Sequence, residues 1–216
     1  MSRNIHPSTF VHPEAVVHPD AMVGADCMLD NGVKIEAGAD LYKKVVVGSG
    51  VTIGNDVLVG NEVLIMDGAS VCAGPLTERH SSDARKICSG TTIGRDVTLH
   101  GEAELGTFAI IPSQSAIAHL GNLGAKKRVV TIYGSELGPR YSIGCQIGVD
   151  IDTVEARVDS RASTKAASAE TYRPFLPIFR SIGDVVQDAY NQQQDYIDEL
   201  MELRKLFGLT LPPTIL

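Results

Sequence analysis

Residues 45–62 read VVVGSG VTIGND VLVGNE, three hexapeptides with one shared pattern. Each has aliphatic residues at its first and third positions and glycine at its fourth. The third-position series continues in both directions without a failure, and its members are Ile5, Val11, Val17, Val23, Leu29, Ile35, Leu41, Val47, Ile53, Val59, Ile65 and Val71. Because a fixed repeat decides the whole fold, this period of six governs the interpretation of the chain.

A second series of small or β-branched residues follows the first at a distance of four. It consists of Thr9, Ala15, Ala21, Cys27, Val33, Ala39, Val45, Val51, Val57, Val63 and Ala69. Both series must point inward, and three edges of six residues close a triangular coil of about 18 residues. The sequence therefore predicts a mainly β fold, a left-handed parallel β-helix of about six coils. Glycine after the aliphatic residue, as at Gly48 or Gly94, suits a crowded corner.

The register breaks once, after Val71, and resumes at Ile87 or Ile93. Ten extra residues account for the shift in phase. The excluded stretch is polar and lacks the repeat, so we expect residues near 74–86 to form a loop that leaves the β-helix at a corner. Long loops on regular scaffolds are often functional.

The pattern dissolves after Gly121, which gives three expected regions. The β-helix covers residues 1–126, a small strand and helix module covers 127–180, and an amphipathic helix with a tail covers 181–216. Within the module, RVVTIY at 128–133 reads as one strand. The module resembles a small domain appended to hexapeptide proteins of bacteria and phages.

The last region predicts one long helix of about seven turns that ends before Gly208. Two arrangements stay open for it. Its apolar residues alternate at spacings of four and three, which suits a coiled coil between subunits with Gln193 as a polar layer. A second stripe, Val185, Ile197 and Met201, widens the apolar face and favours packing on the β-helix.

Composition limits the partners and the compartment. A net charge of −7 and a pI near 5.3 argue against nucleic acid and anionic membranes as partners. No apolar run is long enough to cross a membrane, and no secretory signal begins the sequence, so we expect a cytoplasmic protein. The four cysteines are widely spaced, which indicates neither a disulfide framework nor a zinc ribbon.

The register also predicts which residues are stacked on adjacent coils. Cys72 and His100 are 28 residues apart, one coil plus the ten-residue insertion, and therefore occupy the same corner one coil apart. Adjacent coils are roughly 5 Å apart, so these two side chains are able to meet one ligand.

This corner resembles the metal site of γ-class carbonic anhydrases. Met66 to Cys72 falls on that family's Gln-Asp-x-x-x-x-His segment, and Ile93 to Gly101 on its Ile-Gly-His-x-x-x-x-His-Gly segment. The resemblance implies a metal held by three histidines from two subunits, but His100 is the only histidine retained. Arg95 stands where the neighbouring subunit's ligand belongs, and a guanidinium does not coordinate metals. We therefore expect no metal site and no zinc.

The chain also resembles hexapeptide acyltransferases, in which a loop leaving the β-helix carries a catalytic histidine. The corresponding loop here contains His80 and Asp83. The resemblance implies that His80 is a general base oriented by Asp83. The segment from Gly121 to Arg128 resembles one that closes many of these β-helices, and its Lys126 and Arg128 suit the phosphates of coenzyme A. Such proteins assemble as trimers with sites in the grooves between subunits.

Three functions follow from these patterns. The first is an acyltransferase that uses acyl-CoA as co-substrate at an inter-subunit groove of a homotrimer or of a dimer of trimers. The second is a non-catalytic trimer that binds a small anionic ligand, a nucleotide or a phosphorylated metabolite, and the third is a degenerate γ-carbonic anhydrase-like protein. The residues expected to line the ligand groove are Cys72, Arg79, Arg85, Arg95 and His100.

Overall fold

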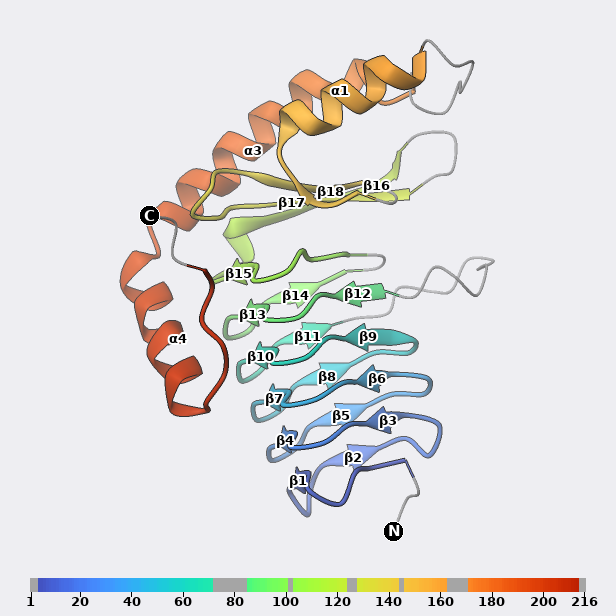
Figure 1. Cartoon of the computed structure of the whole chain (residues 1–216), viewed down its shortest axis with the longest axis vertical. Coiled ribbons are helices and arrows are strands. Elements are labelled where there is room, and N and C mark those ends of the chain that lie inside the picture. The colour runs from blue at the N-terminus through green and yellow to red at the C-terminus, as the bar shows by residue number, and fades with distance from the viewer. Residues whose placement is uncertain are drawn as a thin grey trace.

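The computed structural model of the chain describes residues 4–71, 85–100, 103–123, 128–143, 146–162 and 171–213. Short strands wind upward from the N-terminus into a stack of coils, and helices lie above and beside the stack (Figure 1). The strands of the coils are β1 (Phe10–Val11), β2 (Val16–Val17), β3 (Met22–Val23), β4 (Met28–Leu29), β5 (Lys34–Ile35), β6 (Asp40–Leu41), β7 (Val46–Val47), β8 (Thr52–Ile53), β9 (Val57–Val59), β10 (Leu64–Ile65), β11 (Ser70–Val71), β12 (Arg85–Ile87), β13 (Thr92–Ile93), β14 (Thr98–Leu99) and β15 (Ile110–Ile111).

These strands form the three parallel sheets of a β-helix. The first sheet has the order β1-β4-β7-β10-β13-β15, the second β14-β11-β8-β5-β2 and the third β12-β9-β6-β3. Sheets of six, five and four strands correspond to about five turns, close to the six predicted. The predicted parallel β-helix is confirmed.

The pairing register confirms the ten-residue insertion. Val17 pairs with Ile35, 18 residues away, as in every coil before the insertion. Val71 instead pairs with Leu99 and Ile65 with Ile93, both 28 residues away. The insertion therefore lies between β11 and β12, where the chain turns from the second sheet to the third.

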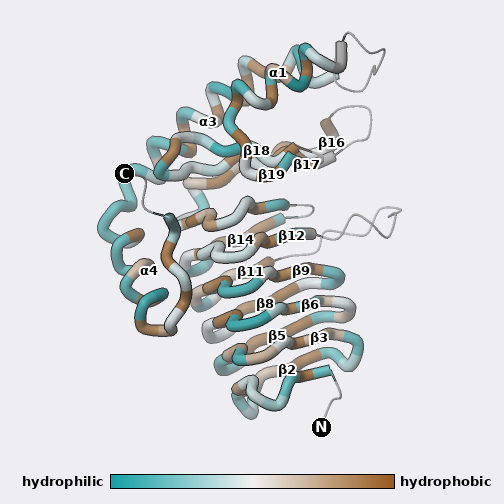
Figure 2. The backbone as a smooth tube through the Cα atoms, in the orientation of Figure 1, coloured by the Kyte–Doolittle hydropathy of each residue, from teal (hydrophilic) through white to brown (hydrophobic). Residues whose placement is uncertain are grey.

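The two inward series form one core that runs the length of the coils. Leu29, Val47 and Ile65, for example, are stacked in the first sheet and have no solvent exposure. Figure 2 shows hydrophobic residues recurring in each coil. Crowding explains the glycine after the aliphatic residue, since a Cβ on Gly94 would lie 2.3 Å from the carbonyl oxygen of Pro112.

A positive φ occurs two residues later, at the corner itself. Gly50 has φ +69° there, and Asp56 has φ 54° at the equivalent position of the next hexapeptide. Glycine and aspartate are among the residues that tolerate this left-handed conformation. Crowding thus explains the glycine that follows the aliphatic residue, and backbone conformation explains the residue type two positions later.

An antiparallel sheet closes the upper end of the coils. After the short 3-10 helix η1 (Gln114–Ala116) it contains β16 (Ile117–Leu123), β17 (Arg128–Tyr133), β18 (Arg140–Ile143) and β19 (Gln146–Val149), in that order. β17 has the bounds predicted from the sequence. Tyr133 joins the core of the coils, and its hydroxyl accepts a hydrogen bond of 3.0 Å from the backbone N–H of Gly106.

The other face of this sheet carries helices. Val130 and Ile132 pack with residues of α1 (Ile151–Ala162) and α3 (Leu176–Asn191), the second of which follows the 3-10 helix η2 (Arg173–Phe175). The sheet thus separates these helices from the coils (Figure 1). None of the helices in the described ranges is long and apolar enough to span a membrane.

The predicted long C-terminal helix is divided in two. α3 ends at Asn191 and α4 (Gln194–Leu206) begins three residues later. The apolar spacing continues across the break, so periodicity alone does not reveal it. α3 packs on the antiparallel sheet whereas α4 packs on the coils, and the chain bends where it passes between these surfaces. Tertiary packing here outweighs helix propensity.

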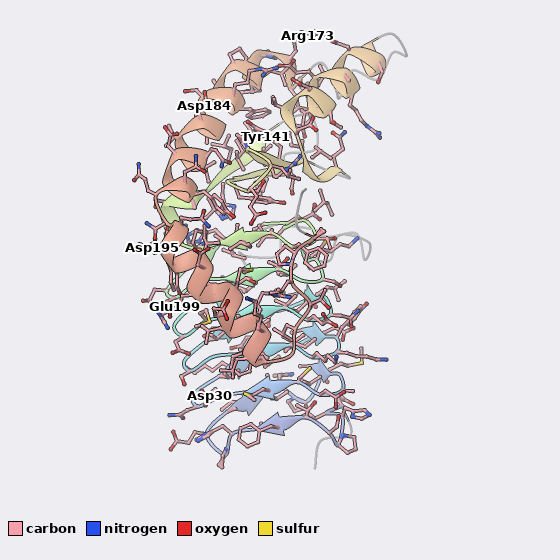
Figure 3. The ribbon with its side chains drawn as sticks, turned by 60° about the vertical axis from the view of Figure 1, so that its left-hand side comes forward. Asp30, Tyr141, Arg173, Asp184, Asp195 and Glu199 are labelled. Carbon is pink, nitrogen blue, oxygen red and sulfur yellow. The ribbon has the colours of Figure 1, made fainter. Side chains whose placement is uncertain are left out.

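α4 lies across the outer face of the first sheet, which favours the second of the two predicted arrangements. Ile197 and Leu200 are buried against Val46, Leu64 and other outward residues of this sheet. Figure 3 shows α4 in front of the coils, with Asp195 and Glu199 on it. Met201 also packs here, but Val185 of the predicted second stripe belongs to α3 and is 65% exposed.

A buried arginine attaches α4 and the tail to the coils. Arg204 has no solvent exposure, and its guanidinium donates to the backbone oxygens of Glu62, Thr91 and Thr210 and to Oγ1 of Thr92. Burial lowers the pKa of Arg204 to about 10, an effect opposed by the charge of Glu62. The side chain is therefore still charged at neutral pH, with all its donors satisfied.

We predict that Arg204→Met lowers the free energy of unfolding by about 3 kcal/mol, because it removes the buried guanidinium whose hydrogen bonds attach α4 and the tail to the coils. Urea unfolding measures this change, and protease cleavage near residues 192–193 should become faster. Lys205→Met is the matched control, since Lys205 is the next residue of α4 and its side chain is 52% exposed. Equal stability of the two variants would contradict the role of Arg204.

Candidate functional site

The insertion begins and ends at one corner of the β-helix. The residues 72–84 lie outside the described ranges, and with them the predicted site residues Cys72, Arg79, His80 and Asp83. Arg85 begins β12 and its backbone pairs with Val57, but its side chain is not described. Lys126 also lies outside the described ranges, and Arg128 is described only as the first residue of β17.

His100 lies on the coil next to the insertion. Its neighbour Leu99 pairs with Val71, the last described residue before the insertion. Cys72 lies outside the described ranges, so the stacking of Cys72 on His100 stays a prediction. The side chain of His100 is exposed.

A second histidine lies beside His100 and was missed by reasoning from the sequence. The ring centroids of His100 and His119 are 6.1 Å apart, and the ring planes are nearly perpendicular at 88°. His119 belongs to β16, in which Ile117 faces the coils while Ala118 and Leu120 face the helices. Alternation along 117–120 is the signal that would have placed His119 on the side of the coils.

Both ring nitrogens of His119 are buried, and they have no hydrogen-bond partner among the residues that the structure describes. Leaving a buried polar atom unpaired costs about 1 to 3 kcal/mol. Burial lowers the pKa of His119 to about 4, and the nearby His100 contributes to this shift. His119 is therefore neutral at physiological pH.

A buried polar row holds His119 in place. Across the sheet, His119 pairs with Thr131 and Thr131 with Ser142, and both hydroxyl residues are buried. Thr131 Oγ1 accepts a hydrogen bond from the backbone N–H of Glu104 at 3.4 Å. The hydrogen bond between Glu104 and Thr131 therefore attaches the antiparallel sheet to the coils beside His119.

Arg95 lies at a different corner from His100. β14 separates the two residues, and Arg95 is an exposed residue that contacts α4. The backbone N–H of Arg95 donates to the hydroxyl of Tyr196, its guanidinium donates to Oε1 of Glu199 at 3.1 Å, and it lies 5.5 Å from the centroid of the Tyr196 ring. The hydrogen bond to Glu199 raises the pKa of Arg95 above its usual value.

A metal site needs several ligating side chains close together. Within the described part of the chain, no group of three or more histidine, cysteine, aspartate or glutamate residues is placed to hold a metal ion. His100 and His119 are a pair of imidazoles, which suits hydrogen bonding and proton transfer.

Comparisons with known proteins found no matching family model and no matching curated protein. Among solved structures, the acetyltransferase domain of PglB from Neisseria gonorrhoeae shares 21% identity over 51% of this chain and 46% of its own length, with a TM-score of 0.37. LpxA from Acinetobacter baumannii shares 21% identity over 50% of this chain and 57% of its own, with a TM-score of 0.20.

An Arabidopsis UDP-N-acetylglucosamine acyltransferase shares 15% identity over 86% of this chain and 96% of its own, with a TM-score of 0.23. At these values the similarities carry no argument about activity. The coils themselves decide the class of fold. The chain is a hexapeptide-repeat β-helix protein. In this hexapeptide-repeat protein, the corner with the insertion, His100 and His119 is the candidate site, which we call the insertion corner.

The shifted pKa of His119 predicts a dependence of stability on pH. Its folded-state pKa of about 4 lies below its ordinary value of 6.5, so the unfolded chain binds more protons between these values. Protonation of His119 should therefore lower the free energy of unfolding by about 3 kcal/mol as the pH drops from 6.5 to 4.

Urea unfolding at several pH values tests this prediction against His119→Phe, which should show a smaller slope over the same range. His12→Phe, near the other end of the β-helix, is the matched control and should keep the slope of the parent protein. An unchanged slope in His119→Phe would contradict the assignment of a depressed pKa to this residue.

Proposed function

We propose that this hexapeptide-repeat protein is an acyltransferase that takes its acyl group from acyl-CoA. The observation that carries the proposal is the ten-residue insertion, the one interruption between Ile5 and Ile117 in a register that is otherwise regular. His80 and Asp83 belong to the sequence that the insertion adds between β11 and β12. Imidazole groups are the usual general bases near neutral pH.

The reaction is a simple acyl transfer. His80 takes the proton of an acceptor hydroxyl or amine as the acceptor oxygen or nitrogen bonds to the thioester carbonyl carbon, and Asp83 orients the ring of His80. The tetrahedral intermediate then collapses, the C–S bond breaks, and the departing thiolate of coenzyme A takes the proton from His80. No other reactant is required.

The donor and the assembly complete the proposal. Lys126 and Arg128 follow the last coil and supply cationic groups for the phosphates of coenzyme A. We place the site in a groove between subunits of a cytoplasmic homotrimer, with pairing of two trimers through the C-terminal helices as the larger assembly. The symmetry of such a ring gives each chain the same groove.

The second candidate, a binding protein for small anions, would rely on Arg95. In the described structure the charge of Arg95 is already paired with Glu199, and its guanidinium lies against Tyr196. An anion would have to displace a carboxylate of the same chain. This competition favours acyl transfer over anion binding at Arg95.

We predict that release of thiol from acetyl-CoA, measured with a panel of sugar and amine acceptors, falls at least 100-fold in His80→Ala, the usual loss when a general base is removed. Asp83→Asn should lower the rate by about 10-fold, because it leaves the base in place but less well oriented. Light scattering should give the mass of three chains for the active species.

His6→Ala is the control for removal of a histidine, since His6 is exposed near the other end of the β-helix. It should keep the full rate. Turnover that survives in His80→Ala, or the absence of turnover with every acceptor, would overturn the proposed function.

A further inference from the structure

Two of the three outer faces of the β-helix are not covered by a helix of the described ranges. The hydrophobic clusters that contain helix residues include outward residues of the first sheet, Val46, Leu64 and Ile110, and of neither other sheet. Each strand of the coils presents an outward residue directly before its inward aliphatic residue. The outer faces of the second and third sheets are therefore the surfaces that the coils leave open to a partner (Figure 1).

The outward residues of these two faces match level by level. β2 and β3 follow each other on the first coil, and their outward residues Val16 and Met22 are 62% and 52% exposed. On the next coil β5 presents Lys34, which is exposed, and β6 presents Asp40, which is half-buried. A pair of opposite charges is thus stacked on a pair of apolar residues. The next two levels place no like charges together, and their pairs are Thr52 with Leu58 and Ser70 with Lys86.

Lys34 and Asp40 have no charged partner in the described part of the chain, where no ion pair includes either residue. They lie on different faces of the β-helix, so their side chains point away from each other within one copy. Burial raises the pKa of Asp40, and no described charge opposes this shift. The third sheet therefore offers a carboxylate, and the second sheet offers an ammonium group at the same level.

We infer that the second sheet of one copy packs against the third sheet of the next copy in a ring of three parallel copies. Lys34 of each copy binds Asp40 of its neighbour, and Val16 packs against Met22 on the coil below. The inference rests on the homotrimer of the proposed function and names the faces and residues that form it. Acyl transfer is not one of its premises.

The matching levels favour a second copy with the same direction over other occupants. Neighbouring copies in a ring are related by rotation about an axis along the coils, so equal levels face each other. A twofold contact reverses the order of the levels. The second sheet against itself offers no acidic outward residue to Lys34, and the third sheet against itself leaves Val16 and Lys34 uncovered. Contact between the two unlike faces covers both exposed apolar residues and pairs both charges.

The same arrangement leaves space for a site between copies. The second and third sheets are adjacent faces of a triangular coil, so they diverge from the corner at which they meet. A groove therefore remains between neighbouring copies beyond their contact. The first sheet and α4 then lie on the outer side of the ring, and α4 takes no part in the contact among the three copies.

The first test exchanges the charges and measures the mass of the assembly by light scattering over a range of protein concentrations. We expect Lys34→Glu and Asp40→Lys each to raise the concentration needed for assembly about 100-fold, because each places like charges opposite one another. The two changes in one chain should restore assembly to within about threefold of the parent protein. Lys43→Glu reverses an exposed charge at the corner between the third and first sheets and is the matched control, which should assemble as the parent does. The melting temperature of each variant checks that it is folded.

The second test locates the contact by cross-linking. Lys34→Cys and Asp40→Cys are made singly and together and are treated with a short bismaleimide. The double variant should give covalent dimers and trimers, and each single variant should give no more than the parent protein, whose own four cysteines set the background. A single variant that forms covalent dimers above this background would show a twofold contact and overturn the inference.

The outcomes separate the inference from the proposed function. If trimers form but the single charge variants assemble like the parent, or the combined variant fails to recover, the trimer stands and the assignment of its faces is wrong. If the parent protein remains a single chain at every concentration, the inference and the proposed trimer are both wrong. Acetyl-CoA turnover in the parent protein and in His80→Ala still decides the chemistry in each case.

Discussion

The stacking of each inward side chain on the residue one coil away is the constraint on which the rest of this structure depends. Along the first sheet, Ile65 lies between Val47 and Ile93, and all three are fully buried. Every residue in such a column, apart from the two at its ends, has an aliphatic neighbour above and below it. A change in size or polarity at one level would therefore disturb two others, because cores of this density tolerate few changes in volume.

The same constraint decides where chemistry is possible. The core of the coils contains no charged side chain among the described residues, so charged functional groups must lie at corners, on outer faces, or where the coils end. The insertion between β11 and β12 uses a corner, and it leaves the pairing of Val71 with Leu99 intact. The row of His119, Thr131 and Ser142 uses the end of the stack, where the repeat stops and an antiparallel sheet with its own alternation begins.

The β-helix is predictable from the sequence because every coil has the same pattern of inward residues. The parallel coils, the shift of ten residues and the strand 128–133 all follow from patterns that a single sequence displays. The break at residues 192–193 does not, since the apolar spacing continues through it and only the different directions of the two packing surfaces cause it. The burial of Arg204 escaped prediction for a similar reason. Its partners Glu62 and Thr91 are more than a hundred residues away along the chain.

The candidate site was predicted in part. The register placed His100 on the coil next to the insertion, but His119 comes from a region where the hexapeptide pattern has ended. The hexapeptide pattern therefore gives no reason to pair His100 with His119. Arg95 was expected to face a groove, and its pairing with Glu199 of α4 was hidden because the position of that helix depends on tertiary packing.

The central claim is that the insertion carries the function while the coils carry the fold. Deletion of residues 75–84 tests it most directly, because it removes ten residues and returns Val71 and Ile87 to a spacing of six. Thermal unfolding and acetyl-CoA turnover are then measured on the same protein. We predict a melting temperature within a few degrees of the parent protein and turnover reduced to the uncatalysed background. Turnover at the parental rate, or a chain that no longer folds, would contradict the account.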